Sequence, residues 1–225
     1  MSRPTVAVID LKALRANFAL AQSLTPGAST IPMVKANAYG HGMIEVSRAL
    51  SESAPAFGVA SIDEALVLRE AGIKQPILLL EGTFSCDEVG VAADNNFILM
   101  VENSVQKDAI LNASISRPVS VWLGIDTGMH RLGFEPHEAT QAYLALSNTD
   151  NVAKPIVAAS HFACADDLGS SATERQVVIF DQCTASMADA TNDVIAKSLG
   201  NSAAILAWPK THRDWQRPGY MLYGN

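Results

Sequence analysis

Short apolar runs alternate with segments of helical periodicity along almost the whole of this 225-residue chain. An apolar run that is separated from the next run by a helix is typical of a parallel strand buried on both faces. Eight such runs are predicted as strands: residues 31–35, 57–60, 77–80, 98–101, 119–125, 156–161, 194–198 and 220–223. Eight strands in alternation with helices favour an α/β fold, a (β/α)8 TIM-type barrel, over an open doubly wound sheet, and the count depends on the fourth and seventh runs.

The predicted helices have recognisable start signals. They are Asp10 before an N-terminal helix over about residues 10–25, Pro136 at a helix N-terminus, and Thr173 with Gln176 at the spacing of a capping box. With 48% hydrophobic residues, a chain of this length builds one substantial core. We therefore expect a single domain over residues 1–225.

Lys35 ends the first apolar run, and a turn of small residues containing glycine follows it. A lysine at the end of a buried strand loses hydration, so its pKa is expected to fall and its neutral amine becomes a nucleophile for carbonyl compounds. Without a motif around it, such a lysine is more often an ordinary ion-pair partner. Because barrel active sites lie at the carboxyl ends of the strands, Lys35 is the first candidate for a covalent site.

Five segments, taken in chain order, resemble segments of the alanine racemase family. They are 34–42 (VKANAYGHG), 126–133 (DTGMHRLG), 160–163 (SHFA, with Asp166), 201–204 (NSAA) and 217–224 (RPGYMLYG). The resemblance covers essentially the whole chain and implies a barrel domain that binds pyridoxal 5'-phosphate (PLP). Family members continue with a β-rich C-terminal domain, so we expect the barrel here to be truncated after its eighth strand and that domain to be absent.

The resemblance also implies roles for individual residues. Lys35 resembles the lysine that binds PLP covalently and serves as one of two catalytic bases. Arg131 resembles the arginine that contacts the cofactor phenolic oxygen and the substrate carboxylate, which suits a planar donor fork. His161 resembles the histidine that packs against the cofactor ring and helps to hold Arg217. The remaining cofactor contacts are implied for Tyr39, Asn201, Ser202, Gly219 and Tyr220, the last two through backbone N–H groups.

Arg217 matches the family's partner of the pyridine nitrogen. In PLP enzymes an acid at this position keeps the nitrogen protonated and makes the ring a strong electron sink. An arginine is itself always protonated, so it leaves the nitrogen unprotonated and the sink weaker. A weaker sink limits transamination and decarboxylation, as a racemase requires. The alternative for Arg217 is a salt bridge at the barrel rim.

Two departures from the family pattern bear on activity. Many alanine racemases carry a carbamylated lysine two residues before the Asp of the DTGM segment, where it braces the arginine that Arg131 matches. Here that position is Gly124, so another acid or a bound anion replaces the brace, or the arginine is less well held. The family's second base is a tyrosine of the C-terminal domain from the other subunit of a homodimer, and it matches no residue here.

The resemblance predicts an isomerase that interconverts L- and D-alanine by two-base α-proton transfer, with the 225-residue chain alone impaired in activity. One alternative is a non-catalytic single-domain PLP-binding barrel concerned with cofactor balance. A second is an amino-acid decarboxylase on the same fold, against which Arg217 argues because decarboxylases place an acid there.

Charge and cysteine content limit the remaining possibilities. The formal charge of −7 comes without a basic run, which argues against nucleic acid or an anionic membrane as partner. Three cysteines without CxxC spacing indicate neither a disulfide framework nor a zinc site. No signal peptide or apolar stretch of membrane-spanning length is recognised. We therefore expect a cytoplasmic protein, without a bound metal, that is a homodimer in its full-length form.

Overall fold

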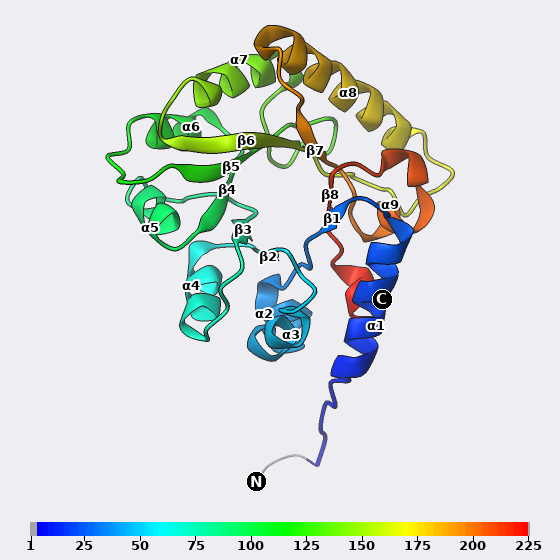
Figure 1. The fold of residues 1–225 in the computed structure, drawn as a ribbon. Helices are drawn as coiled ribbons and strands as arrows, with labels where there is room; N and C mark the ends of the chain where they lie inside the picture. The colour runs from blue at the N-terminus through cyan, green and yellow to red at the C-terminus, as the bar shows by residue number, and fades with distance from the viewer. Residues whose placement is uncertain (1–3, 225) are drawn as a thin grey trace.

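The computed structural model describes residues 4–224, in which eight parallel strands form one curled sheet surrounded by helices (Figure 1). The strands are β1 (Ser29–Thr30), β2 (Phe57–Val59), β3 (Ile77–Leu79), β4 (Phe97–Val101), β5 (Val119–Gly124), β6 (Val152–Ala159), β7 (Ala196–Ser198) and β8 (Trp215–Gln216). Their order is β1-β8-β7-β6-β5-β4-β3-β2. A parallel bridge between Met33 and Gly58 joins the two ends of this order, so the sheet closes into a (β/α)8 barrel.

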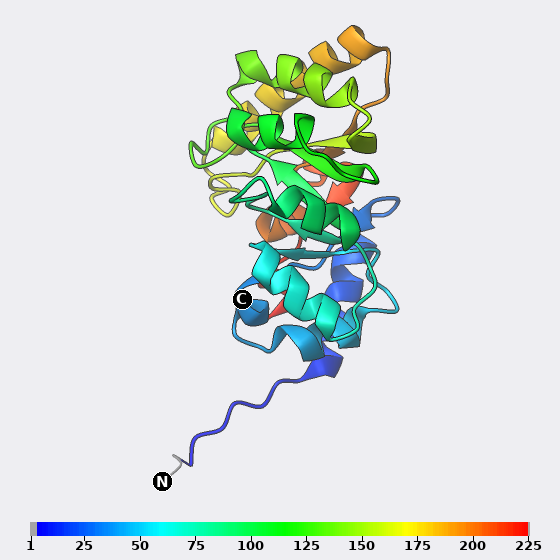
Figure 2. The same cartoon turned by 90° about the vertical axis from the view of Figure 1, so that its left-hand side faces the viewer.

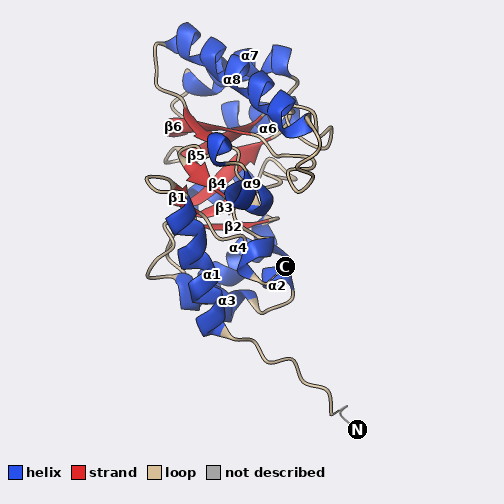
Figure 3. Cartoon of the chain, turned by 90° about the vertical axis from the view of Figure 1, so that its right-hand side faces the viewer, coloured by secondary structure: helices blue, strands red, loops and turns tan. Residues whose placement is uncertain are grey.

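The helices lie outside the strands, as the view coloured by secondary structure shows (Figure 3). They are α1 (Leu11–Leu24), α2 (Lys35–Tyr39), α3 (Met43–Leu50), α4 (Ile62–Glu70), α5 (Glu88–Asp94), α6 (Ser104–Leu111), α7 (Pro136–Ser147), α8 (Ala172–Thr191) and α9 (Ser202–Ala207), with 3-10 turns η1 (Pro209–Thr211) and η2 (Tyr220–Leu222). Residues 4–10, which precede α1, extend away from the barrel (Figure 2). No helix in residues 4–224 is long and apolar enough to cross a membrane.

Alternation along the strands divides the buried side chains into two cores. Val101 of β4 and Leu123 of β5 belong to the larger core, which includes the buried faces of the helices. Met100 and Trp122, their neighbours in sequence, belong to a smaller core inside the barrel. Because successive side chains of a strand point to opposite faces, runs that are apolar throughout supply both cores. The predicted runs for the second to seventh strands are confirmed, with ends shifted by up to four residues.

The predictions for the first and eighth strands are wrong. The first strand is Ser29–Thr30, upstream of the predicted 31–35, although extended backbone continues to the bridge at Met33. The eighth is Trp215–Gln216, whereas residues 220–223 fall in the η2 turn and its end. The apolar character of the η2 residues reflects packing of Met221 against Ala21 of α1 rather than membership of the sheet. Periodicity alone does not separate a short buried strand from a buried turn.

Two of the three helix signals act as predicted. The Asp10 carboxylate accepts hydrogen bonds from the backbone amides of Lys12 (2.8 Å) and Ala13 (3.0 Å) and so caps α1. Pro136 is the first residue of α7. The predicted capping box at Thr173 and Gln176 is wrong, because α8 already begins at Ala172.

Helix α1 covers part of the barrel wall that would otherwise be open. Its buried residues Leu14, Phe18 and Ala21 are at most 4% exposed, and the helix packs against β1, α3, α9 and η2. The outer face of β1 is therefore covered by this N-terminal helix.

Candidate active site

A cavity of about 860 Å³ opens at the carboxyl ends of the strands. Its wall includes all nine residues that the sequence singled out: Lys35, Tyr39, Arg131, His161, Asn201, Ser202, Arg217, Gly219 and Tyr220. These residues come from segments that follow β1, β5, β6, β7 and β8. The structure therefore brings all nine residues to one site. Gly219 lies after the eighth strand, β8.

Lys35 is held by an unusual backbone. The four residues after it, Ala36 to Tyr39, all have φ between 51° and 54°, which forms a left-handed turn that Gly40 ends at φ 88°. Left-handed geometry costs a non-glycine residue about 1–2 kcal/mol. The turn is supported by the Glu64 carboxylate, which accepts from the Ala36 amide at 2.7 Å, and by the Asn37 side chain, which accepts from the Met43 amide at 2.9 Å.

The environment of Lys35 favours its neutral amine. Burial is the main reason that the pKa of Lys35 is lowered, and the positive charges of Arg131 and Arg217 act in the same direction. Glu81 and Glu64 oppose this shift only in part. None of the ion pairs of residues 4–224 includes Lys35. An amine with a lowered pKa is available as a nucleophile and as a base.

Arg217 is 4% exposed and lies at the floor of the cavity. Its guanidinium donates to the Ser198 hydroxyl, to the Ser160 carbonyl oxygen at 2.5 Å and to the Leu199 carbonyl oxygen at 3.5 Å. Burial lowers the pKa of Arg217 to about 10, while the carboxylate of Glu102 acts to raise it. At neutral pH the guanidinium is therefore still protonated and has only donors to offer.

His161 is kept neutral. Burial, and after it the positive charges of Arg217, Arg131 and Lys35 in that order, lower the pKa of His161 to about 3. The expectation that the histidine helps to hold Arg217 is not matched by its bonding in residues 4–224, because the Arg217 hydrogen bonds go to Ser160, Ser198 and Leu199. A neutral imidazole on the wall presents a flat, uncharged ring to the cavity.

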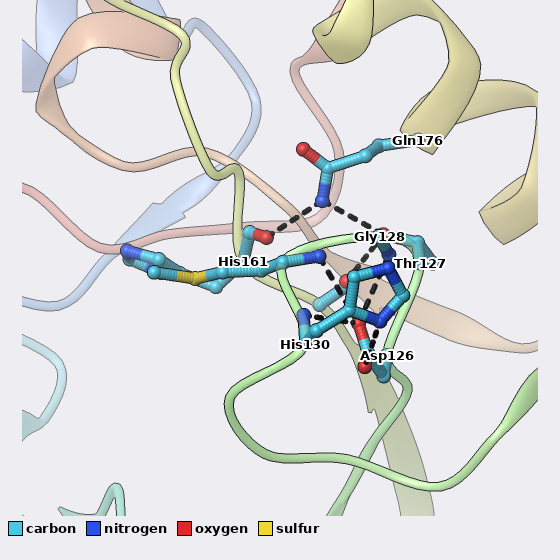
Figure 4. A network of polar contacts seen from close by, with 8 residues as sticks. Asp126, Thr127, Gly128, His130, His161 and Gln176 are labelled. Carbon is cyan, nitrogen blue, oxygen red and sulfur yellow. Dashed lines mark hydrogen bonds and ion pairs between the residues drawn. The ribbon is translucent and has the colours of Figure 1, made fainter.

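A polar network joins the loops after β5 and β6 (Figure 4). The Gln176 side chain of α8 donates to the Thr127 hydroxyl at 3.1 Å and to the His161 carbonyl oxygen at 2.9 Å, and accepts from the Ala163 amide at 3.0 Å. The Thr127 hydroxyl also bonds the Ser160 hydroxyl at 2.8 Å. Gln176 thus serves as a clasp between two cavity loops rather than as a helix cap.

Asp126 shapes the loop that carries Arg131. One carboxylate oxygen accepts from the amides of Gly128, Met129 and His130 at 2.9, 3.1 and 3.0 Å, and the other pairs with the His130 ring at 3.0 Å (Figure 4). Burial by itself would raise the pKa of Asp126, but the hydrogen bonds from His130 and Gly128 outweigh it and lower that pKa. Arg131 is exposed, and no ion pair of residues 4–224 includes it.

A second corner of the cavity is formed by Ser202, Gly219 and Tyr39. The Ser202 hydroxyl accepts from the amides of Gly219 (2.9 Å) and Met221 (3.2 Å). A Cβ atom at position 219 would overlap the Tyr39 hydroxyl and lie 3.0 Å from Tyr39 Cζ, so glycine is required for this close approach. Asn201, in contrast, is occupied as the N-cap of α9, accepting from the Ala204 amide at 3.0 Å.

Three contributors were missed in the sequence. Tyr223 stacks on Tyr39 with ring centroids 4.9 Å apart and donates its hydroxyl to the Met33 carbonyl oxygen at 2.8 Å. Gln176 was predicted only as part of a helix cap, and the residues that its side chain holds lie 13, 15 and 49 positions away in the sequence, so no local pattern marks this role. Glu102 comes directly after β4 and lines the cavity. A polar residue at the carboxyl end of a predicted strand is the pattern that indicates such a position.

Comparison with known proteins agrees with the site. The family model described as alanine racemase, N-terminal domain, matches residues 9–225. Over 222 residues the chain is 45% identical to an alanine racemase of Pseudomonas syringae and 46% identical to a catabolic alanine racemase of Pseudomonas aeruginosa. Each of these matches covers 99% of this chain and 60% of the relative.

Solved structures give the same result. The biosynthetic alanine racemase from Pseudomonas aeruginosa matches with a TM-score of 0.91 at 41% identity, covering 100% of this chain and 61% of that one. An alanine racemase from Clostridium difficile in complex with cycloserine matches with a TM-score of 0.90 at 28% identity, covering 98% of this chain and 63% of that one. The chain therefore spans about 60% of the length of these relatives and belongs to the alanine racemase family, whose N-terminal barrel domain it matches.

Proposed function

We propose that the protein racemises alanine with PLP, and that Lys35 is the residue that binds the cofactor covalently. The observation that carries this proposal is that the desolvated Lys35 amine and the buried, protonated Arg217 line one cavity. The relatives named as alanine racemases supply the reaction, and the cavity chemistry is consistent with it.

The residues of the cavity fit PLP in three respects. The Lys35 amine is suited to bond the cofactor aldehyde because its pKa is lowered. The corner of Ser202, Gly219 and Tyr39 offers hydroxyl and amide groups for the phosphate, with Asn201 and the Tyr220 amide beside it. Arg217 offers a donor, and no acid, to the pyridine nitrogen.

Bound PLP withdraws electrons from the substrate α-carbon and so acidifies the α-proton. Lys35 Nζ removes or returns that proton on one face of the α-carbon. The Arg131 guanidinium binds the substrate carboxylate and thereby fixes which face Lys35 meets. Arg217 retains its own proton, which limits electron withdrawal and suppresses side reactions.

Racemisation by two bases needs a second group on the opposite face. We assign that base to the part of the family's length that this chain does not span, and we infer a cytoplasmic homodimer as the assembly that delivers it. Residues 1–225 alone should then racemise alanine about 10²- to 10⁴-fold more slowly than the same barrel joined to the remaining family domain. Similar turnover in the two would mean that the second base lies within this chain.

Neither alternative is favoured. A non-catalytic PLP-binding barrel shares the covalent lysine, but the matched relatives are named for a reaction. A decarboxylase uses an acid as the partner of the ring nitrogen. In this cavity the buried residue that matches that position is an arginine, Arg217.

The test is to load the full-length protein with PLP, reduce with borohydride and map the labelled peptide by mass spectrometry. Lys35 should carry the label, and formation of D-alanine from L-alanine should be lost in Lys35→Arg. Lys74→Arg is a matched control, because Lys74 is exposed and does not line the cavity. A label on another lysine would sink the assignment of Lys35, and a labelled but inactive protein would sink the racemase proposal.

A further inference from the structure

Glu102 is a largely buried acid in the cavity wall that the proposed reaction does not use. It follows β4 directly, and the β4–β5 register pairs Met100 with Trp122 and Val101 with Leu123. Extending this register by one residue brings Glu102 beside Gly124. Residues paired in a parallel sheet point to the same face, so Glu102 faces the barrel interior like Met100 and Trp122.

The Glu102 carboxylate occupies the space that a side chain at position 124 would need. A Cβ atom built on Gly124 would overlap Glu102 Oε2 and lie 2.6 Å from Glu102 Cδ. The backbone of Gly124 is in β5 and is not among the positive-φ glycines, so its conformation does not require glycine. The reason for glycine at this position is therefore the room that it leaves for Glu102.

The backbone of Glu102 is fixed from outside the cavity. Its amide donates to the Gln106 side chain at 2.8 Å, and Gln106 in turn donates to the carbonyl oxygens of Glu81 (2.7 Å) and Thr83 (3.1 Å). Gln106 is 8% exposed, so these bonds are shielded from water. The carboxylate is thus delivered to the cavity from a rigid strand end.

Glu102, Arg131 and Arg217 line the same cavity, and no ion pair within residues 4–224 joins the Glu102 carboxylate to either guanidinium group. Burial raises the pKa of Glu102 to about 7, whereas Arg217 and Arg131 lower it and Asp126 raises it. Within residues 4–224 every hydrogen bond of the Arg217 guanidinium goes to an uncharged acceptor, and neither arginine has an ion pair. Glu102 is an acid of the cavity wall whose pKa responds to both positive charges.

We propose that Glu102 is a positioning residue, the shared counter-charge of Arg131 and Arg217, and that Gly124 exists to admit it. The proposal rests on the proposed function in so far as Arg131 binds the substrate carboxylate. Where the family pattern has a long side chain at position 124, this chain has a carboxylate from the neighbouring strand. Glu102 and Gly124 are therefore a matched pair, and changing one alone should disturb the site.

The packing half of the proposal is tested by thermal unfolding of the cofactor-free protein. Gly124→Ala should lower Tm by several degrees, on the order of 5 °C, because the new Cβ meets Glu102. In a Glu102→Ala background the same change should alter Tm by no more than about 1 °C. Gly90→Ala is the control for a glycine replaced without any new contact, since no atom lies within 4 Å of a Cβ at that helical position, and it should raise Tm rather than lower it. Equal effects in both backgrounds would overturn the pairing.

The charge half is tested by steady-state racemisation in the full-length protein. Glu102→Gln keeps the shape and removes the charge, and should raise KM for alanine about tenfold with a smaller change in kcat, because Arg131 is no longer held. Glu102→Asp should lie closer to wild type than Glu102→Gln, although glutamine is the better match in size. The reverse order would indicate a purely structural role.

A fall in KM in Glu102→Gln would also overturn the proposal, because it would mean that Glu102 only repels the substrate carboxylate. Failure of the proposed function is distinguishable from these outcomes. If wild type does not racemise alanine, the reaction is wrong, whereas the Tm cycle at positions 102 and 124 still decides the pairing.

Discussion

The Gln176 side chain donates a hydrogen bond of 2.9 Å to the carbonyl oxygen of His161, so a helix on the outside of the barrel holds a residue on the cavity rim. The same amide group bonds Thr127 and Ala163, and Gln176 is 3% exposed. The loops that present Arg131 and His161 therefore depend on one amide for their mutual position.

Gln176→Ala should destabilise the protein and loosen the site together. Removing the amide leaves the His161 carbonyl oxygen and the Ala163 amide without this partner, which costs about 1–3 kcal/mol of unfolding free energy. KM for alanine should rise as well, because the loop of Arg131 loses its clasp. Chemical denaturation and steady-state kinetics measure the two effects. Gln182→Ala, an exposed residue of the same helix, should change neither, and an unaltered KM in Gln176→Ala would argue against the clasp.

Glycine should be tolerated, or even favourable, in the left-handed turn after Lys35. Ala36 is exposed at φ 51°, so Ala36→Gly removes a conformational cost of about 1–2 kcal/mol and adds an entropic cost of roughly 0.5–1 kcal/mol. We expect a net gain of a few tenths to about 1 kcal/mol in unfolding free energy. Ala185→Gly, at an exposed position inside right-handed α8, should instead lose about 0.5–1 kcal/mol. Losses of equal size at both positions would contradict the left-handed geometry.

The buried neutral His161 should contribute a loss of stability in acid to the cofactor-free protein. Its folded pKa of about 3 lies below the unfolded value of 6.5, so between these values only the unfolded state binds the proton and stability falls as pH falls. From pH 6.5 to 5 this amounts to about 2 kcal/mol. Glu102, whose pKa is raised from 4.5 to about 7, has the opposite slope across the same interval and a contribution of similar size, so the two contributions nearly cancel in wild type.

Comparison with a variant isolates the histidine. Relative to wild type, His161→Gln should raise the free energy of unfolding at pH 5 over that at pH 6.5 by about the amount above, as measured by urea unfolding at several pH values. His137→Gln, at an exposed position of α7, should leave the curve as it is. Parallel curves for His161→Gln and wild type would show that His161 is not desolvated.

Exchanging Arg217 for an acid should change which reaction dominates. Arg217→Glu places a carboxylate where the buried guanidinium lies, and a carboxylate keeps the cofactor nitrogen protonated and strengthens electron withdrawal. The ratio of pyruvate to D-alanine formed from L-alanine should rise at least about tenfold. Arg217→Gln loses the guanidinium hydrogen bonds without adding an acid, so it should not raise the ratio as far. Equal ratios in the two variants would mean that charge at this position does not control the reaction.

The central strands were predictable because their sequences are apolar on both faces, as the fully buried residues of β2 and β3 show. The first and eighth strands were not predictable, since β1 and β8 contain two residues each and carry polar side chains such as Ser29 and Gln216. Their place in the sheet depends on tertiary pairing rather than on local composition.

The candidate residues were found through contiguous motifs, and the cavity now contains all nine of them. What the motifs did not reveal is the support around them. The pattern at Gln176 indicated a helix cap, and neither that pattern nor the position of Glu102 at a strand end revealed the contacts that these residues make across the fold. The left-handed turn of residues 36–39 has no sequence signal because alanine and tyrosine rarely adopt it. Long-range contacts and strained backbone are set by packing of the whole chain.

The barrel closes beside Lys35 at one residue pair, Met33 and Gly58, and only the β7–β8 pairing is similarly short within residues 4–224. Two backbone hydrogen bonds form this closure. The Val34 amide donates to the Gly58 carbonyl oxygen at 2.8 Å, and the Gly58 amide donates to the Pro32 carbonyl oxygen at 3.0 Å. Local opening of this seam would admit water to the amine while the rest of the sheet stays paired. Deuterium uptake at these two backbone amides therefore reports how often the Lys35 amine becomes hydrated. It thereby reports the fraction of time in which that amine is dry and able to react.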